Sequence, residues 1–127
     1  PFDGLAVSMP HIGGVEIADD CEIGANCTIA GGTIFPTRIL TNVRIDDQVF
    51  IAHNCYIGEG TAIIAQSEIS GSVIIEKNCW IGPGSSITQK VTIGERSLIG
   101  IGSNVTSNVE PGSVSAGNPA KKIRDNK

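Results

Sequence analysis

Large aliphatic residues recur at every sixth position along most of this chain. A first run begins at Ile17, and a second run starts at Ile39 and continues without a slip to Val105. The residue two positions before each of these aliphatic positions is always small or β-branched. Residues two apart in a strand point to the same face, so both positions face inward. Self-similarity at this period predicts a hexapeptide β-helix.

Three short strands of this kind make one triangular coil of about 18 residues, and successive coils stack about 4.8 Å apart. The predicted fold is therefore all-β, a parallel β-helix of about five coils over residues 15–108. Residues 1–14 lack a clean period and are interpreted as a lead-in or cap. The one break in phase predicts a bulge loop at residues 30–38, where Pro36 fits a bend better than a central strand. Residues 109–127 are expected to leave the solenoid as a non-repeat tail that packs along its side.

Glycine follows several of the aliphatic positions. These glycines are Gly24, Gly58, Gly82, Gly94 and Gly100. Because glycine adopts backbone angles that other residues avoid, we expect these positions at corners where the backbone turns sharply.

The charge balance argues against a nucleic-acid partner. The net charge is −4 and the pI is near 5.0, whereas nucleic-acid binders show a basic patch or stripe. Several basic residues do cluster at the C-terminus, where they are either solvated or able to meet phosphates or an acidic partner protein. They are Lys121, Lys122, Arg124 and Lys127.

No apolar run approaches the ~20 residues that a membrane helix needs, and no signal segment opens the chain. We therefore expect a cytoplasmic protein without a membrane span. Because the first residue is Pro1 rather than methionine, a processed piece or an excised domain is also considered.

The cysteines and histidines raise the question of a metal site. All four cysteines, Cys21, Cys27, Cys55 and Cys79, occupy the small inward position of the repeat. They are therefore predicted to be buried structural thiols rather than metal ligands or disulfides. A γ-class carbonic anhydrase shares this fold but needs three histidines for zinc, and the chain has two. No metal is expected.

His53 is the candidate catalytic residue. It lies near a predicted corner and is followed by Asn54, with Asp46 and Asp47 one hexapeptide earlier. Gly71 comes 18 residues later, so stacking places it directly over His53. A base beside a backbone N–H that can stabilise an oxyanion is the minimum apparatus for acyl transfer.

Three segments carry a family resemblance: DDCEIGANCTIAGGTI, RIDDQVFIAHNCYIGEGTAIIAQSEISGS and EKNCWIGPGSSI. Over roughly residues 10–90 they resemble the left-handed β-helix domain of the UDP-3-O-acylglucosamine N-acyltransferases of lipid A biosynthesis, a lipopolysaccharide pathway. The closing VEPGSVSAGNPAKKI is similar to the end of smaller sugar O- and N-acetyltransferases. IAHNC also resembles the HDC motif of sugar-nucleotide N-acetyltransferases.

The resemblance implies a left-handed coil and a homotrimer with active sites between subunits. It implies that His53 is the general base, that Asn54 belongs to the catalytic group and that the Gly71 N–H stabilises the oxyanion. The implied acyl donor is a pantetheine thioester, either acyl-CoA or acyl carrier protein. Its predicted contacts are Gly71, Gln89, Ala116, Lys121 and Lys122.

For the acceptor, an amino-sugar nucleotide, the predicted contacts are Asp46, Asp47 and His11. The chain has Gln89-Lys90 where the lipid A enzymes commonly have Gly-His, which favours a short acyl group such as acetyl. The predicted function is therefore transfer of a short acyl group, from acetyl-CoA, to the amino group of a sugar nucleotide. Two alternatives remain open: a long-chain UDP-3-O-acylglucosamine N-acyltransferase activity with acyl carrier protein, and a catalytic fragment or non-catalytic β-solenoid.

Overall fold

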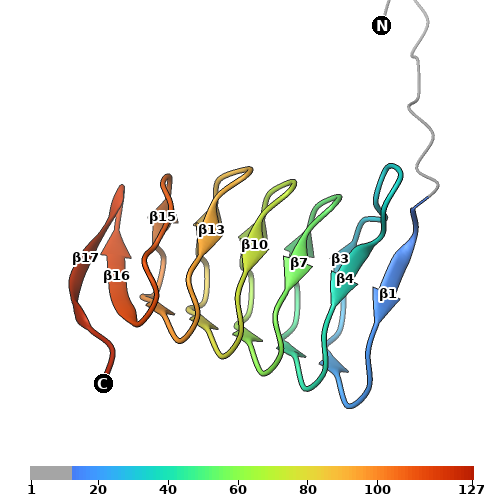
Figure 1. The fold of residues 1–127 in the computed structure, drawn as a ribbon, viewed down its shortest axis with the longest axis horizontal. Coiled ribbons are helices and arrows are strands. Elements are labelled where there is room, and N and C mark those ends of the chain that lie inside the picture. The colour runs from blue at the N-terminus through green and yellow to red at the C-terminus, as the bar shows by residue number, and fades with distance from the viewer. Residues whose placement is uncertain (1–12) are drawn as a thin grey trace, which may run out of the picture.

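The structure is a computed structural model that describes residues 13–127, and these residues form short strands and tight turns without a helix. Figure 1 shows them as a row of stacked coils, with β1 at one end and β17 at the other. From β1 to β15 every third strand joins the same sheet, so three sheets form the sides of a triangular prism. The predicted all-β solenoid is confirmed.

The three sheets are named here by their first strand. Sheet 1 contains β1 (Val15–Ile17), β4 (Thr37–Ile39), β7 (Tyr56–Ile57), β10 (Ile74–Ile75) and β13 (Thr92–Ile93). Sheet 2 contains β2 (Glu22–Ile23), β5 (Arg44–Ile45), β8 (Ala62–Ile63), β11 (Trp80–Ile81), β14 (Leu98–Ile99), β16 (Ser113–Gly117) and β17 (Ala120–Asp125). Sheet 3 contains β3 (Thr28–Ile29), β6 (Phe50–Ile51), β9 (Glu68–Ile69), β12 (Ser86–Ile87) and β15 (Asn104–Val105). In the described part of the chain, β1 to β15 make five complete coils, close to the number predicted.

Paired residues of neighbouring coils are 18 apart, as Ile57 and Ile75 are, except in the first coil. There Val15 pairs with Thr37, 22 residues later. The first coil is thus longer by four residues, and they fall in the loop 30–36 between β3 and β4. Because the insertion is confined to one corner, every strand keeps its place in its sheet.

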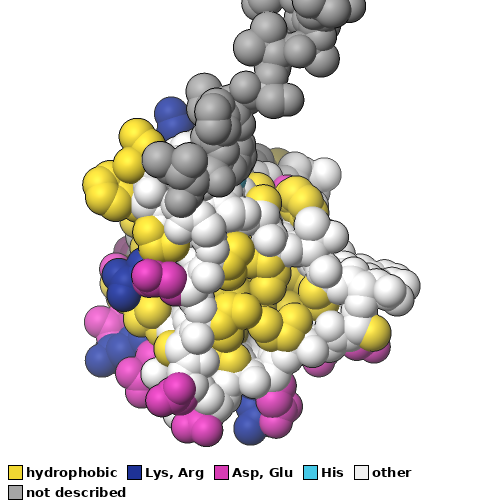
Figure 2. All heavy atoms as spheres, turned by 90° about the vertical axis from the view of Figure 1, so that its right-hand side faces the viewer, with side chains coloured by type: hydrophobic (Ala, Val, Ile, Leu, Met, Phe, Trp, Pro, Cys, Tyr) yellow, Lys and Arg dark blue, Asp and Glu magenta, His cyan; other side chains and the backbone are white. Residues whose placement is uncertain are grey.

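The aliphatic positions form the core. From Ile39 to Val105 each is at most 3% exposed. At the β1 end, where one side of the first coil faces outward, Val15, Ile17 and Ile23 are 38–50% exposed. Figure 2 looks onto this end and shows hydrophobic side chains gathered at the centre of the end face. The hydrophobic interior therefore runs along the axis of the prism.

The small inward position carries a hydrogen-bond donor in many coils. Ser67 Oγ donates to Gly82 O (3.0 Å) and Cys79 Sγ to Gly94 O (3.2 Å), each 15 residues ahead. In the longer first coil, Cys27 Sγ reaches Asp46 O (3.0 Å), 19 residues ahead. Serine, threonine and cysteine thus satisfy a corner carbonyl of the next coil.

The cysteines are free, as the repeat phase predicts. Cys55 and Cys79 are buried, and desolvation is the main reason that the pKa of each thiol rises to about 11. Cys21 and Cys27 are half-buried because they belong to the first coil. Among residues 13–127 no group of three or more His, Cys, Asp or Glu side chains is arranged to hold a metal ion.

The predicted role of the glycines after the aliphatic positions is wrong. The left-handed backbone lies two residues further on, as at Asn54 (φ 60°) and Asn78 (φ 58°). Gly58 and Gly82 are instead needed for close approach: a Cβ there would lie 2.6 Å and 2.7 Å from backbone atoms of the next coil. Stacking of the coils, rather than the sharpness of the turn, selects glycine at these positions.

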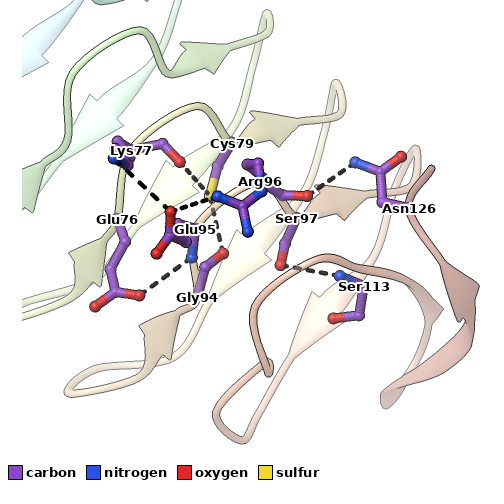
Figure 3. Close-up of polar contacts among 9 residues, drawn as sticks. All are labelled: Glu76, Lys77, Cys79, Gly94, Glu95, Arg96, Ser97, Ser113 and Asn126. Carbon is purple, nitrogen blue, oxygen red and sulfur yellow. Dashed lines mark hydrogen bonds and ion pairs between the residues drawn. The ribbon is translucent and has the colours of Figure 1, made fainter.

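The C-terminal segment also differs from the prediction that it packs along the side. β16 adds to sheet 2 in parallel beside β14, and β17 then pairs antiparallel with β16. Two hydrogen bonds tie this segment to the last full coil: the side chain of Ser97 accepts from the Ser113 N–H at Oγ (3.4 Å), and the side chain of Asn126 donates from Nδ2 to the backbone carbonyl of Arg96 (2.9 Å; Figure 3). The segment therefore covers the end of the prism. Within the described residues no helix is long and apolar enough to cross a membrane.

The buried thiols predict a loss of stability at alkaline pH. Unfolded cysteines ionise near pH 8.5, whereas Cys55 and Cys79 keep their protons to about pH 11 in the fold. The unfolded state therefore binds fewer protons across this window, and the free energy of unfolding falls as pH rises. The effect should be on the order of 2 kcal/mol per thiol at most. Urea denaturation at pH 8 and pH 10.5 measures it.

The matched variant is Cys55→Val combined with Cys79→Val, because valine occupies the same position at Val73 and Val91. Its free energy of unfolding should fall less between the two pH values than that of the wild type. An equal fall in both proteins would assign the alkaline loss to other groups.

Candidate active site

His53 lies at the corner between sheet 3 and sheet 1, in the turn from β6 to β7. The loop 30–36 occupies the same corner one coil nearer to β1. On the other side, residues 70–72 stack on residues 52–54, and the Ser72 N–H donates to His53 O (2.9 Å). The imidazole is therefore placed between the inserted loop and the next coil, with its side chain exposed to solvent.

Gly71 lies against the imidazole, as the 18-residue spacing predicts. A Cβ on Gly71 would be 2.7 Å from His53 Nε2 and 2.8 Å from Cε1. Gly58 and Gly82 avoid contacts with backbone, whereas Gly71 makes room for a side chain. The glycine is thus required by the ring of His53 rather than by the coil.

The Gly71 backbone is suited to stabilise negative charge. Its carbonyl accepts from the Lys90 N–H (3.0 Å), while its own N–H donates to none of the described residues. A backbone N–H beside a base can donate to an oxyanion that forms there.

Asn54 sets the tautomer of His53. Asn54 Nδ2 donates to Phe35 O (3.2 Å), which fixes the amide so that Oδ1 faces the imidazole. Oδ1 lies 3.1 Å from His53 Nδ1 and also accepts from the Thr33 N–H (3.3 Å). Since an amide oxygen only accepts, Nδ1 carries the proton in the neutral ring. The lone pair is then on Nε2, the nitrogen next to Gly71.

The inserted loop and the first residue of β4 support Asn54 through backbone atoms and the hydroxyls of Thr33 and Thr37. Thr37 Oγ1 accepts from the Asn54 N–H (2.9 Å) and donates to Ala30 O (2.7 Å). The side chains at the tip of the loop, Ile34 and Phe35, point away and are 69% and 75% exposed. The sequence showed the insertion but not that it holds Asn54, the residue next to His53.

The column of His53 and Gly71 continues with Gln89 and Ser107, each 18 residues further. It ends at a hollow of about 420 Å³ between the last turn and the C-terminal hairpin. The lining residues are Ser107, Asn108, Val109, Glu110, Ser113, Ser115, Ala120, Lys121 and Lys122. With coils about 4.8 Å apart, Ser107 is about 14 Å along the column from His53.

The two lysines of the hollow have different surroundings. Lys122 is ion-paired with Glu110 and with Asp125 (2.7 Å). Its hydrogen bonds, first to Asp125 and then to Glu110, raise its pKa to about 12, and the bond from Lys122 lowers the pKa of Asp125. Lys121 is exposed and pairs in register with Ala116, which does not line the hollow.

The structure does not bring the predicted acceptor residues to His53. Asp46 and Asp47 lie at the corner between sheet 2 and sheet 3, one strand before His53. There Asp47 Oδ1 accepts from the Ala25 N–H (2.8 Å). His11 lies outside the described residues.

Comparison with known proteins agrees with this geometry. The family described as bacterial transferase hexapeptide (six repeats) matches residues 72–107. Residues 72–107 are thus similar to the hexapeptide-repeat transferases.

Among curated proteins, the chain is 40% identical over 122 residues to a UDP-3-O-acylglucosamine N-acyltransferase of Methylobacterium nodulans, covering 96% of this chain and 35% of that protein. A protein of the same name from Chlorobium luteolum is 53% identical over 68 residues, 54% of this chain and 19% of that protein. The chain spans about a third of the length of the first of these relatives.

Among solved structures, LpxA from Acinetobacter baumannii superimposes with a TM-score of 0.86 at 27% identity, covering 88% of this chain and 45% of that chain. A coil of the opposite hand would not superimpose in this way. The left-handed parallel β-helix predicted from the resemblance is therefore confirmed.

Gly71→Ala tests the contact between Gly71 and the imidazole. The backbone of Gly71 is outside the left-handed region, so alanine is tolerated by the coil, but its methyl group displaces the His53 ring. If His53 is the general base of an acyl transfer, as the resemblance implies, the rate of that reaction should fall by about 10²-fold or more, the span that a general base contributes. Steady-state kinetics and a melting curve measure the two effects separately.

Gly102→Ala is the matched control. It adds a methyl group in open space at a residue with φ of 63°, so it costs stability without touching His53. Full activity in Gly71→Ala, or an equal loss of activity in both variants, would contradict the proposed contact.

Proposed function

We propose that this chain is the catalytic β-helix of an N-acyltransferase that moves an acyl group from a pantetheine thioester to the amino group of a sugar nucleotide. One observation carries the proposal: Nε2 of His53 faces Gly71, while Nδ1 is held by Asn54. The names of the relatives point to the same class of reaction.

In the proposed mechanism, the amine of the acceptor attacks the thioester carbonyl. His53 Nε2 takes one N–H proton as the new C–N bond forms, and the Gly71 N–H donates to the carbonyl oxygen as it becomes negative. The C–S bond then breaks, and the imidazolium returns its proton to the departing thiolate. The products are an amide and a free thiol, and the imidazole is neutral again.

Asn54 has a positioning role in this mechanism. It keeps Nδ1 protonated in the neutral ring, so the basic nitrogen is the one that faces the reacting atoms. Being uncharged, it orients the ring without the electrostatic support that a carboxylate would give the imidazolium.

The donor is proposed to lie along the column from Gly71 past Gln89 to the hollow at Ser107. This places the thioester at His53 and the far end of the pantetheine arm at the C-terminal hairpin. Lys121 and Lys122, together with the backbone at Ala116, are proposed to attract the phosphates of coenzyme A. Acetyl-CoA is the proposed donor.

A second candidate is transfer of a long acyl chain from acyl carrier protein. It is favoured by the curated relatives, which are named UDP-3-O-acylglucosamine N-acyltransferase. The basic residues of β17 would then meet an acidic carrier protein. A homotrimer in the cytoplasm, with each site completed by a neighbouring subunit, is proposed for both candidates.

His53→Ala should lower kcat by roughly 10²–10⁴-fold, the contribution of a general base. Asn54→Ala should lower it less, because the ring remains but loses the bond that fixes its tautomer. Steady-state kinetics with acetyl-CoA and an amino-sugar nucleotide measure both effects. The control is Asn42→Ala, which removes an asparagine with the same φ of 60° at another corner. Wild-type rates in His53→Ala would remove His53 from the mechanism and favour a non-catalytic solenoid.

Thermal stabilisation by donors decides between the two candidates. A ligand present at 100 times its Kd adds about 2.7 kcal/mol to the free energy of unfolding, which gives a clear shift in Tm. A shift with acetyl-CoA supports the short-chain reaction. A shift with acyl carrier protein alone supports the long-chain reaction, and no shift with either contradicts donor binding by this chain.

A further inference from the structure

The outward side chains of the three sheets differ in chemistry. From β8 onward, sheet 2 presents an apolar row that includes Trp80 and Leu98. Sheet 1 presents Tyr56 and Ile74 at the level of His53. Sheet 3 presents an otherwise polar row with one aromatic ring: Thr28, Phe50, Glu68, Ser86 and Asn104.

Glu68 is the carboxylate of sheet 3 nearest in the fold to the active-site turn. Both of its oxygens accept from Ser70 Oγ (3.0 and 2.9 Å), and Ser70 directly precedes Gly71. Glu16 and Glu22 are balanced by Arg38 and Arg44 on the neighbouring strands. Among residues 13–127, by contrast, no lysine or arginine is ion-paired with Glu68. Ser70 therefore holds the Glu68 carboxylate near the active-site turn, and no lysine or arginine of the described residues neutralises its charge.

Phe50 lies beside Glu68. The two residues are register partners in β6 and β9, so their backbones are about one strand spacing, 4.8 Å, apart. The Phe50 side chain is 41% exposed, and it belongs to the strand that leads into His53. An aromatic ring and a carboxylate are therefore presented side by side on one face.

This pair is suited to a pyranose that carries an amino group. An aromatic face packs against the apolar C–H face of the sugar ring. A carboxylate accepts strong hydrogen bonds from an ammonium group or from hydroxyl groups.

We propose that sheet 3 is the acceptor platform, with Phe50 under the sugar ring and Glu68 holding its amino group next to His53. The inference rests on the proposed function, because it names the surface that delivers the amine to the base. Glu68 attracts the ammonium form, and loss of one proton to solvent leaves the nucleophilic amine facing Nε2. The acceptor then approaches across sheet 3, while the donor lies along the corner column.

Binding of two nucleotides tests the two contacts separately. The probes are UDP-glucosamine, which has a free amine, and UDP-N-acetylglucosamine, in which the amine is capped. Wild-type protein should bind UDP-glucosamine more tightly in isothermal titration calorimetry. Glu68→Gln keeps the shape and the bond from Ser70, and it should weaken UDP-glucosamine binding by about 10–100-fold with little effect on the capped nucleotide. Phe50→Ala should weaken both by about 3–10-fold.

Glu22→Gln is the control, since it removes a carboxylate from the first position of a two-residue strand on sheet 2. It should bind both nucleotides like the wild type. Equal affinity of the wild type for both nucleotides, no binding of UDP-glucosamine, or an equal loss in Glu22→Gln would overturn the acceptor platform. Acetyl-CoA binding measured on the same samples keeps the two proposals apart. If the protein binds acetyl-CoA but binds the two nucleotides equally, the acceptor platform on sheet 3 is rejected, while the proposed acyl transfer is not.

Discussion

Each coil of this protein is held by the one beside it, through backbone hydrogen bonds at a spacing of about one strand. The bond from the Tyr56 N–H to Val73 O and the equivalent bond from the Ile74 N–H to Val91 O repeat along the stack. The interior adds a second bond where serine, threonine or cysteine donates to a corner carbonyl ahead of it. The sequence repeat follows from this arrangement, because each coil must present hydrogen-bond donors at the same positions and have the same width as the coils beside it.

The same constraint positions the candidate chemistry. Residues 18 apart are neighbours, so a histidine and a glycine that are distant in the chain meet at one corner. The imidazole is fixed from both sides, by Gly71 in the next coil and by Asn54 with the inserted loop. Rigid stacking thus replaces the loops that carry active-site residues in many enzymes.

The fold was largely predictable from the sequence. The six-residue period is visible in the chain, and so is the inward pair that each repeat carries, a small residue followed two positions later by an aliphatic one. Gly71 over His53 followed from the same period. The glycines after the aliphatic positions were misjudged, since their reason is contact with the next coil and not the backbone angle. The hairpin of β16 and β17 has no repeat to indicate it. The role proposed for Glu68 was not predicted from the sequence, because closeness in sequence drew attention to Asp46 and Asp47, whereas the stack places these two at another corner.

The loop 30–36 separates two tasks that are often combined in one segment. It supports Asn54 mainly with main-chain groups: the Thr33 N–H, which any residue except proline can supply, and the Phe35 carbonyl, which any residue can supply. Its most exposed side chains, Ile34 and Phe35, contribute nothing to that support. Substitutions can therefore change the side chains at the tip of the loop while the orientation of the imidazole is preserved. In the proposed acyltransferase, this corner is a place where relatives can diverge in substrate preference while His53 keeps its orientation.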